Sequence, residues 1–339
     1  MASPAHDILI VGAGVLGLST ASVLRARGHA VTVVDPGGPN ASSVAAGMIA
    51  PAMESAAEDV TPERADLYRR AAARWPVFAA EAGVDVVPAM AEWRGEGWDQ
   101  IAERLRALGF AAETTERGVR APQDLRLSPT AALKRLADGV GRIEGRVETV
   151  TGDAQGWVVR LADGRTLTAQ AVILATGADE RMGGLPPSVR AALDAATPVR
   201  GQIGFVGQAL ADRTLRGRAG YVTPVDGGVV IGATMEAGRR DLTPDAETSE
   251  RLRRAAEALL EQSIDPAAVK WCVGVRGASA DGLPLAGLAA PGLAVALAPR
   301  RNGWMLGPLV GEIVADAVEG RAPRPEAAAF DPMRFSRAG

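Results

Sequence analysis

A glycine pattern directly after the first apolar run constrains the fold of this chain more than any other feature. In "ILIVGAGVLG", residues 8–17, Gly12, Gly14 and Gly17 follow a strand-like stretch and open an amphipathic segment at about 15–27. The first glycine permits a tight turn, the second lets backbone approach a pyrophosphate, and the third permits close helix–strand packing. Free N–H groups at such a helix start attract an anion. The stretch therefore predicts a dinucleotide-binding βαβ unit.

An acidic residue completes this unit. "AVTVVD", residues 30–35, is typical of a second buried strand, and it ends at Asp35, followed by Pro36. A carboxylate at this place accepts hydrogen bonds from ribose hydroxyls and disfavours a 2′-phosphate. The alternative is a glycine-rich turn that holds no ligand, but the strand, the helix and the acid occur together here in the order that the motif requires.

The glycine pattern alone does not separate NAD from FAD. A second stretch, "TAQAVILATGA" at 168–178, reads as a buried strand that ends in Ala175, Thr176 and Gly177. It resembles the motif by which many flavoproteins return the chain beneath FAD, although any buried strand with a turn would fit it. Taken together, the two stretches favour FAD as the cofactor.

The length and composition indicate a globular protein of two domains. The chain has 339 residues, of which 47% are apolar and 23% charged, and β-rich and α/β stretches alternate along it. We expect an α/β fold in which a Rossmann-like FAD-binding domain (1–60, 125–195 and 270–339) carries a β-rich α+β substrate-binding domain (61–124 and 196–269), both discontinuous in sequence.

Several classes of function are disfavoured by charge and residue usage. A net charge of −3 without long basic runs argues against nucleic acid as a partner. Cys272 is the only cysteine, and His6 and His29 are the only histidines, so we predict no disulfide and no metal site. Cys272 is expected to be a small buried hydrophobe. No membrane span and no targeting segment are recognised, which predicts a cytoplasmic protein.

Four further blocks resemble a known family. "SSVAAGMIAPAMES" (42–55) and the segments 220–238, 274–287 and 300–316 are similar, in the same order, to glycine oxidases and related D-amino-acid-oxidase-type enzymes, including those of thiazole biosynthesis. The resemblance implies FAD-dependent oxidative deamination of a small amine or amino acid, with glycine, sarcosine or a small D-amino acid as favoured substrates.

The resemblance also implies three site residues. Arg276, in "GVRG", matches the arginine that grips the substrate carboxylate, a role that suits the planar, bidentate guanidinium. Tyr221 matches a tyrosine beside the same carboxylate, and Arg301 matches an arginine near the mouth of the site. The plain alternatives are a half-buried strand tyrosine and a solvated surface arginine.

The residues assigned to the cofactor come from the two motifs and the resemblance. The N-terminus of the last helix is expected at the flavin pyrimidine edge, where its dipole would stabilise negative charge, and Met48 would line the ring or fill the core. The full set is Gly12, Gly14, Val15, Leu16, Gly17, Asp35, Pro36, Ser42, Ser43, Ala46, Gly47, Met48, Val147, Ala175, Thr176, Gly177, Arg276, Asn302, Gly303, Trp304 and Met305.

The implied chemistry needs no protein base. The uncharged amine would deliver its Cα–H as hydride to flavin N5, water would hydrolyse the imine, and O2 would reoxidise the flavin to give hydrogen peroxide. Three alternatives stay open: a dehydrogenase with another electron acceptor, a flavin-binding protein without turnover, and a plain NAD dehydrogenase. Glycine oxidases often form homo-oligomers, but no residue pattern here decides the oligomeric state.

The chain departs from the family pattern near the expected pocket. Gly277 stands where the family has proline, Cys272 where it has tryptophan, and residues 299–300 are Pro-Arg instead of Gly-His. Trp304 replaces a smaller aliphatic residue. It would narrow the cavity for glycine or reshape it for an N-substituted amine, and the exact substrate therefore stays open.

Overall fold

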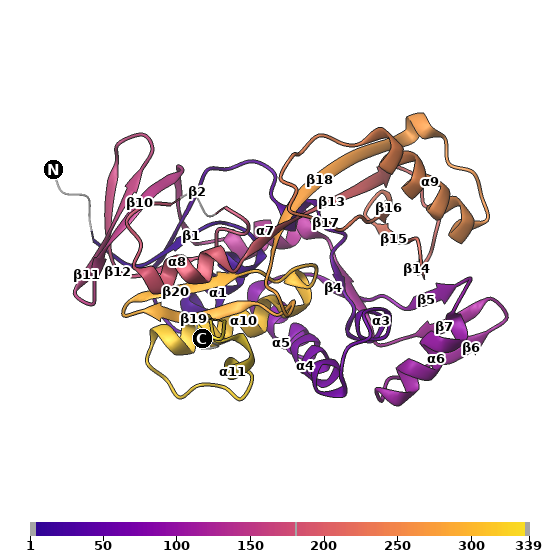
Figure 1. Ribbon diagram of the computed structural model, residues 1–339, viewed down its shortest axis with the longest axis horizontal. Helices are drawn as coiled ribbons and strands as arrows, with labels where there is room; N and C mark the ends of the chain where they lie inside the picture. Colours follow the sequence, from indigo (N-terminus) through magenta and orange to yellow (C-terminus); the bar gives the residue numbers. More distant parts are fainter. Residues whose placement is uncertain (1–4, 180–181, 336–339) are drawn as a thin grey trace. The chain divides into compact units, whose positions relative to one another are not determined.

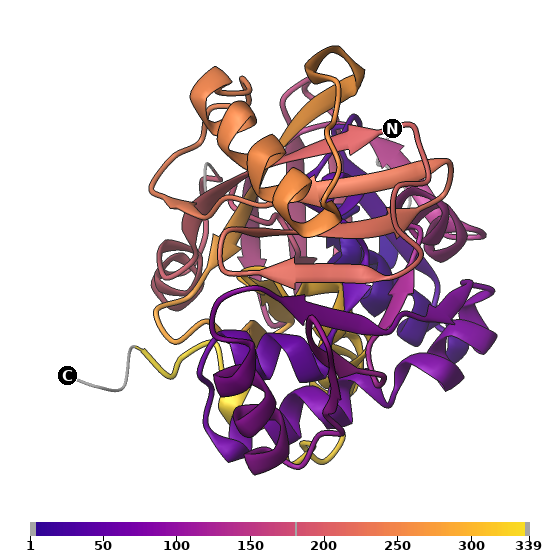
Figure 2. The same cartoon turned by 90° about the vertical axis from the view of Figure 1, so that its right-hand side faces the viewer.

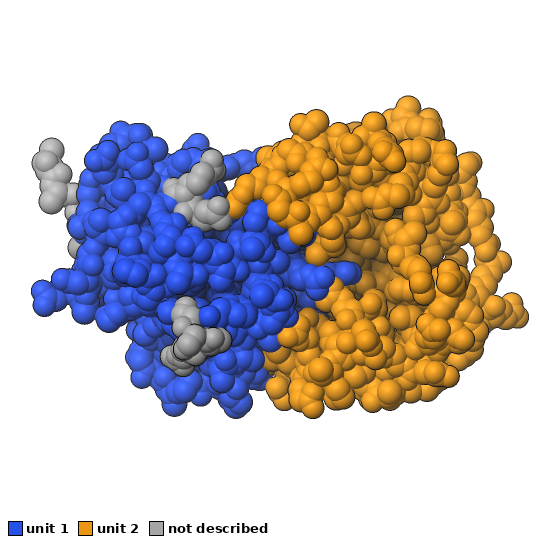
Figure 3. Space-filling view, viewed as in Figure 1, with its two compact units in different colours: residues 1–43, 133–199, 276–339 blue, residues 44–132, 200–275 orange. Residues whose placement is uncertain are grey.

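The structure is a computed structural model that describes residues 5–179 and 182–335 (Figure 1 and, turned by 90°, Figure 2). It consists of two compact units (Figure 3). Unit 1 comprises Met1–Ser43, Leu133–Val199 and Arg276–Gly339, and unit 2 comprises Val44–Ala132 and Arg200–Val275. Both units are discontinuous in sequence.

The unit boundaries differ from the expected domain boundaries at all four places. Residues 44–60 and 125–132, which the sequence analysis grouped with the FAD-binding domain, lie in unit 2. Residues 196–199, expected in the substrate-binding domain, lie in unit 1, and residues 270–275, expected in the FAD-binding domain, lie in unit 2. The association of FAD with one unit and substrate with the other stays a prediction. Residues 1–4, 180–181 and 336–339, which fall in the expected FAD-binding domain, lie outside the described residues.

Unit 1 is built on an eight-stranded sheet whose centre is parallel. Strand β1 pairs in parallel with β2 and β12, β2 with β9, and β12 with β20. The inner strands contain buried apolar runs, residues 8–11 in β1 and 172–174 in β12, as is typical of a parallel sheet that is covered on both faces. The strands are β1 (Ala5–Val11), β2 (Val31–Asp35), β9 (Gly141–Glu144), β10 (Val147–Asp153), β11 (Gly156–Leu161), β12 (Thr166–Leu174), β19 (Leu285–Ala290) and β20 (Leu293–Leu297).

Two long helices of unit 1 pack against each other. Helix α1 (Val15–Ala26) lies along α10 (Gly303–Val318) (Figure 1). A Cβ at Gly311 would lie 2.9 Å from the carbonyl oxygen of Ser19, so glycine permits this close approach. Shorter helices are α8 (Pro187–Asp194) and α11 (Ala327–Phe330), while α2 (Ala41–Val44) and α7 (Pro129–Ala137) pass from one unit to the other.

Unit 2 contains a nine-stranded sheet with α9 (Ala246–Leu260) packed on β14, β15 and β16 (Figure 2). The strand order is β17-β13-β16-β15-β14-β5-β7-β6, and β18 pairs with β13. These strands are β5 (Ala91–Arg94), β6 (Glu113–Thr115), β7 (Gly118–Ala121), β13 (Thr197–Val206), β14 (Thr214–Gly217), β15 (Gly220–Val225), β16 (Gly228–Gly232), β17 (Glu236–Ala237) and β18 (Val269–Ala278). Apolar side chains of α9 and the sheet form its core.

The remainder of unit 2 is helical, with one small sheet. Strand β8 (Leu125–Leu127) pairs with both β3 (Met48–Ile49) and β4 (Val86–Pro88). The helices are α3 (Pro51–Ala57), α4 (Pro62–Ala72), α5 (Trp75–Ala82) and α6 (Trp98–Ala107). Residues 62–82 form two helices instead of one, because Pro76 lacks the N–H that a continuous helix would need there.

The expected fold class is confirmed, since a parallel α/β sheet and a larger, mostly antiparallel sheet occur in one chain. Between Pro88 and Gly97 the chain forms strand β5 (Ala91–Arg94), which pairs in parallel with β14. Over the residues that the structure describes, every helix is too short or too polar to cross a membrane.

Candidate functional site

The structure brings the two predicted cofactor motifs together in unit 1. Gly12 has a φ of 109°, and a Cβ there would lie 2.3 Å from the carbonyl oxygen of Ala175. The amide of Ala175 in turn donates to the carbonyl of Val11 at 2.8 Å. The glycine turn therefore rests directly on the end of β12, where "ATG" begins, and only glycine fits at its first position.

The start of helix α1 presents backbone donors at this turn. Its N-cap, Gly14, offers no side-chain acceptor, and the amide of Val15 donates to Ser42 Oγ at 3.0 Å. Ser42 comes from α2, so a predicted cofactor residue far along the chain lies at the helix start. Such a helix end is suited to bind a pyrophosphate through its N–H groups and dipole.

Asp35 lies at the edge of the same turn with its carboxylate held by backbone. Its Oδ2 accepts from the amide of Ala13 at 2.7 Å, and its Oδ1 accepts from the amide of Gly37 at 2.8 Å. The carboxylate oxygens keep further lone pairs for ribose hydroxyls. The next residue, Pro36, is exposed.

The start of helix α10 meets the start of α1. A Cβ at Gly303 would lie 3.1 Å from the side chain of Val15. The indole N–H of Trp304 donates to the carbonyl of Ser42 at 3.2 Å. Ser42 thus contacts both helix starts, through its hydroxyl and its carbonyl. The predicted cofactor residues Asn302, Gly303, Trp304 and Met305 are all buried here.

Arg276 stands beside the second cofactor motif. The next residue, Gly277, is so close to this motif that a Cβ would lie 2.8 Å from the carbonyl oxygen of Gly177. The carbonyl of Gly277 accepts from the amide of Arg300 at 2.9 Å. The segments that carry Arg276 and Arg301 are therefore adjacent. The tight approach gives a physical reason for glycine at 277.

In unit 2, two further predicted site residues lie beside a small apolar cluster. Met48 and Tyr221 both pack against the buried residues Ala46, Ile203 and Val230. The ring of Tyr221 lies over Gly232, where a Cβ would be 2.8 Å from the phenol oxygen. This contact positions the hydroxyl of Tyr221 on one face of the sheet.

Four residues predicted to bind the cofactor make only ordinary packing or turn contacts. Val147 is buried in the core of unit 1, Leu16 is buried within α1, and Ser43 closes the turn at Asn40 through its hydroxyl. A Cβ at Gly47 would lie 2.1 Å from the carbonyl oxygen of Leu127. Nothing in these contacts adds to their predicted roles.

The expectation that Cys272 is a buried hydrophobe is wrong. Cys272 is exposed, whereas Trp271 packs against Gly204. Successive side chains of strand β18 point to opposite faces, and position 272 falls on the solvent side.

A buried charged cluster in unit 2 was missed by the sequence analysis. Arg216 Nη1 donates to Glu54 Oε1 at 2.7 Å, and its Nη2 lies 3.3 Å from Met48 Sδ. Asp124 Oδ1 accepts from the amide of Ala52 at 3.1 Å. Burial raises the pKa of Asp124 to about 7, although the charge of Arg216 opposes the shift. Of Glu54, Asp124 and Arg216, only Glu54 lies in one of the four blocks that resemble the family, namely residues 42–55.

Metal chemistry finds no support in the part of the chain that the structure describes. No group of three or more His, Cys, Asp or Glu side chains within residues 5–179 and 182–335 could hold an ion. The residues at the glycine turn instead fit a dinucleotide: backbone donors at α1, a carboxylate at Asp35 and a turn that excludes any Cβ at Gly12.

Comparison with known proteins agrees with this chemistry. A family model described as "FAD dependent oxidoreductase" matches residues 7–317. Glycine oxidase of Geobacillus kaustophilus is 31% identical, with 98% of this chain and 96% of that protein covered. The crystal structure of glycine oxidase from the same organism superposes with a TM-score of 0.81 at 28% identity, covering 98% of this chain and 99% of that one.

A second group of relatives is longer. The tRNA 5-methylaminomethyl-2-thiouridine biosynthesis bifunctional protein MnmC of a Caulobacter species is 29% identical over 97% of this chain. The chain spans only 57% of the length of that relative.

Proposed function

Because the chain belongs to the family of FAD-dependent oxidoreductases, we propose that it oxidises a small amine or amino acid, with glycine, sarcosine or a small D-amino acid as favoured substrates. The observation that carries the proposal is the similarity to glycine oxidase at 31% identity along nearly the whole of both chains. FAD, when bound, would supply the redox chemistry, which is acceptance of a hydride from the substrate Cα. O2 is the proposed electron acceptor.

The residues of this chain would bind the cofactor and the substrate, orient the substrate, and exclude water from the site. The helix starts at Val15 and Gly303, with Asp35, would hold the cofactor. Arg276 would bind the substrate carboxylate through two parallel charge-assisted hydrogen bonds, with Tyr221 as a further donor, which fixes the Cα–H bond in one orientation. Arg301 would lie at the entrance. Water would hydrolyse the imine product without a protein base.

A second candidate is oxidation of an amine on a larger molecule. The MnmC relative, whose name refers to a methylaminomethyl group in tRNA, is nearly as similar to this chain as the glycine oxidase is. The net charge of −3 does not favour a large nucleic-acid partner. We therefore rank this candidate second. Cytoplasmic location and homo-oligomeric assembly remain predictions.

The experiment that tests the proposal is an anaerobic visible spectrum of the purified FAD-loaded protein. Glycine, sarcosine, small D-amino acids and unfractionated tRNA are added separately. Bleaching of the flavin band by a small amine supports the proposal, and bleaching by tRNA alone supports the second candidate. Yellow protein that nothing bleaches contradicts both and favours flavin binding without turnover. Readmitting air then distinguishes an oxidase from a dehydrogenase by the rate at which the colour returns.

The role of Arg276 has its own control. Arg276→Ala removes the bidentate partner of the carboxylate and is expected to raise the KM of carboxylate substrates by a factor of at least about ten. Arg324→Ala, a partly exposed arginine whose ion pairs lie near the end of α10, is the matched control and should leave KM unchanged. An unchanged KM in Arg276→Ala would refute the assignment.

A further inference from the structure

Arg216 lies beside Tyr221 on the sheet of unit 2. In the antiparallel pair β14–β15, Arg216 stands directly opposite Tyr221. Residues opposite each other in such a pair project to the same face, with Cβ atoms about 5 Å apart. A guanidinium therefore lies next to the tyrosine that is proposed to contact the substrate carboxylate. Its Nη2 also reaches Met48 Sδ at 3.3 Å.

This guanidinium is already occupied by an internal carboxylate. Glu54, on α3, accepts from Arg216 Nη1 at 2.7 Å, and the two side chains are only 6% and 4% exposed. A buried arginine without such an anion would attract another one, because an unpaired buried charge is costly. Glu54 supplies the anion that this buried guanidinium requires.

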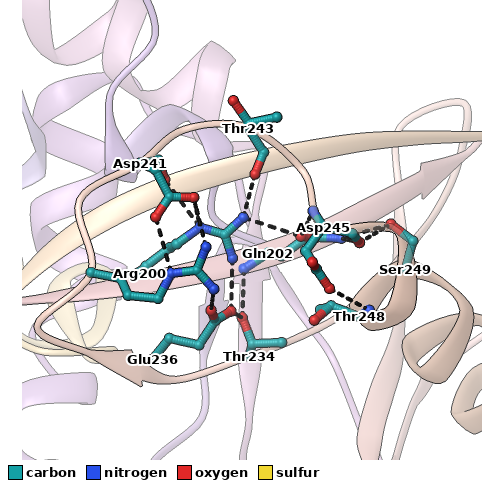
Figure 4. A network of polar contacts seen from close by, with 10 residues as sticks. Arg200, Gln202, Thr234, Glu236, Asp241, Thr243, Asp245, Thr248 and Ser249 are labelled. Atoms are coloured by element: carbon teal, nitrogen blue, oxygen red, sulfur yellow. Dashed lines mark hydrogen bonds and ion pairs between the residues drawn. The ribbon is translucent and has the colours of Figure 1, made fainter.

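The same unit shows what a purely structural buried arginine looks like. Arg200 is fully buried, and each of its nitrogens is bonded: Nε to the carbonyl of Asp241, Nη1 to Glu236, and Nη2 to Gln202 and Thr243 (Figure 4). Arg216 Nε, by contrast, is buried with no hydrogen-bond partner among the described residues. The hydrogen bonding of Arg216 is therefore incomplete, unlike that of Arg200. A purely structural role does not explain why Arg216 is paired with Glu54.

A second carboxylate lowers the charge of the cluster further. Asp124 is buried, its Oδ1 accepts from the amide of Ala52 on the helix that carries Glu54, and its carboxyl feels the charges of both Arg216 and Glu54. Its Oδ2 is without a hydrogen-bond partner in the described part of the chain. Two acids beside one arginine leave the cluster neutral or negative according to the protonation of Asp124. An additional anion beside Tyr221 is thus not attracted by the cluster, and it is repelled when Asp124 is charged.

We propose that Glu54 masks Arg216 and thereby makes this pair a determinant of substrate specificity: it admits monocarboxylic amines and disfavours substrates with a second carboxylate. The inference rests on the proposed function, because Tyr221 is assigned to the substrate carboxylate there. In this scheme Arg216 does not bind the substrate while Glu54 is charged. Its charge becomes available to a ligand only when Glu54 is neutral.

The test measures anion binding to the FAD-loaded protein, without turnover. Acetate and malonate are titrated separately, and the perturbation of the flavin absorbance gives a Kd for each. Glu54→Gln retains an oxygen that can accept from Arg216 but removes the negative charge. It is expected to tighten malonate about tenfold while changing acetate less than about twofold, because a charge-assisted pair becomes available to the second carboxylate only.

Two control variants separate charge from structure. Adding Arg216→Gln to Glu54→Gln should abolish the gain for malonate. Glu92→Gln is the matched control: Glu92 is a buried glutamate of the same unit, also paired with arginines, but it stands opposite Leu215 and therefore on the other face of the sheet. It should leave the malonate-to-acetate ratio of Kd values unchanged.

Each outcome decides the inference. An unchanged ratio in Glu54→Gln, or a gain that survives Arg216→Gln, would overturn it. If Glu54→Gln does not fold, Asp124→Asn at about pH 8 removes a charge from the same cluster; it should shift the ratio in the same direction, and no shift would overturn the inference. Failure of the proposed function is separate, since it shows as a flavin band that no monocarboxylic amine bleaches.

Discussion

The indole N–H of Trp304 donates to the carbonyl oxygen of Ser42 at 3.2 Å, and the hydroxyl of Ser42 accepts from the amide of Val15 at 3.0 Å. The starts of α10 and α1 are thus joined through one serine. Trp304 belongs to the residues predicted to hold the cofactor, and it was also expected to narrow or reshape the substrate cavity. Its observed bond gives this tryptophan a part in ordering the segment expected to hold FAD.

Trp304→Phe is expected to weaken FAD binding about fivefold, because one neutral hydrogen bond contributes about 1 kcal/mol. Titration of the apoprotein with FAD, followed by flavin fluorescence, measures the Kd. Trp157→Phe is the matched control: Trp157 is equally buried in unit 1, but its indole N–H has no hydrogen-bond partner among the described residues. Equal Kd values for the two variants would show that the bond to Ser42 has no effect.

Gly277→Ala tests the contact between the Arg276 segment and the second cofactor motif. The new methyl group would start 2.8 Å from the carbonyl oxygen of Gly177, so the strand must shift, at a cost of about 1–3 kcal/mol. The free energy of unfolding in urea measures the loss. Gly207→Ala is the control, since the nearest atom to its Cβ is a side-chain carbon at 3.8 Å. A Gly277→Ala protein as stable as the parent would contradict the close contact between residue 277 and the carbonyl oxygen of Gly177.

The parts of the fold that sequence could predict are those encoded by consecutive residues. The βαβ unit from β1 to Asp35 needs only a strand, a glycine turn and a helix that follow one another. The β11–β12 hairpin, with "ADGR" at its turn, is likewise encoded by consecutive residues. The periodicity and turn residues lie within each segment, so no distant partner was needed to recognise them.

The missed parts depend on residues far apart in the chain. Strand β5 is short and pairs with β14, more than a hundred residues later in the chain. No local sequence pattern therefore predicts it. The Glu54, Asp124 and Arg216 cluster is assembled by the β3–β8 pairing and by β14. Each of these residues alone is typical of a solvated surface position. Only tertiary structure shows that they share one buried site.

Asp124 predicts how the stability of the protein depends on pH. Its pKa is about 7 in the folded chain, against an ordinary value of 3.8, chiefly because burial disfavours the charged form. The folded state therefore binds the proton more tightly. This contribution to stability is complete below about pH 4 and is lost as the pH rises through about 7, at about 1.4 kcal/mol per unit of pKa difference.

Asp124→Asn should remove this dependence. The amide oxygen still accepts from Ala52, and the side chain stays neutral at every pH. We expect the stability of the parent relative to the variant to decrease between about pH 5 and pH 8, as measured by urea unfolding at each pH. Asp226→Asn, at an exposed turn, should show no such difference. A parallel pH profile for the parent and Asp124→Asn would mean that Asp124 titrates normally.

Arg200 anchors the segment that joins β16 to α9. It is fully buried and bonds Glu236, the carbonyl of Asp241 and the carbonyl of Thr243 (Figure 4). Arg200→Leu leaves these acceptors buried without their donor, and we expect a loss of about 3–5 kcal/mol in the free energy of unfolding. Hydrogen exchange should increase most over residues 233–245, because these are the residues that Arg200 holds.

Arg239 provides the comparison that separates burial from pairing. It bonds the same acids, Glu236 and Asp241, but its side chain is 48% exposed. Solvent screens such pairs, so Arg239→Gln should cost less than about 1 kcal/mol and leave exchange of the segment nearly unchanged. Similar losses in the two variants would show that the acids, and not the buried position of Arg200, determine the order of this segment. A large difference would identify the buried guanidinium as the group that fixes the path of the chain between β16 and α9.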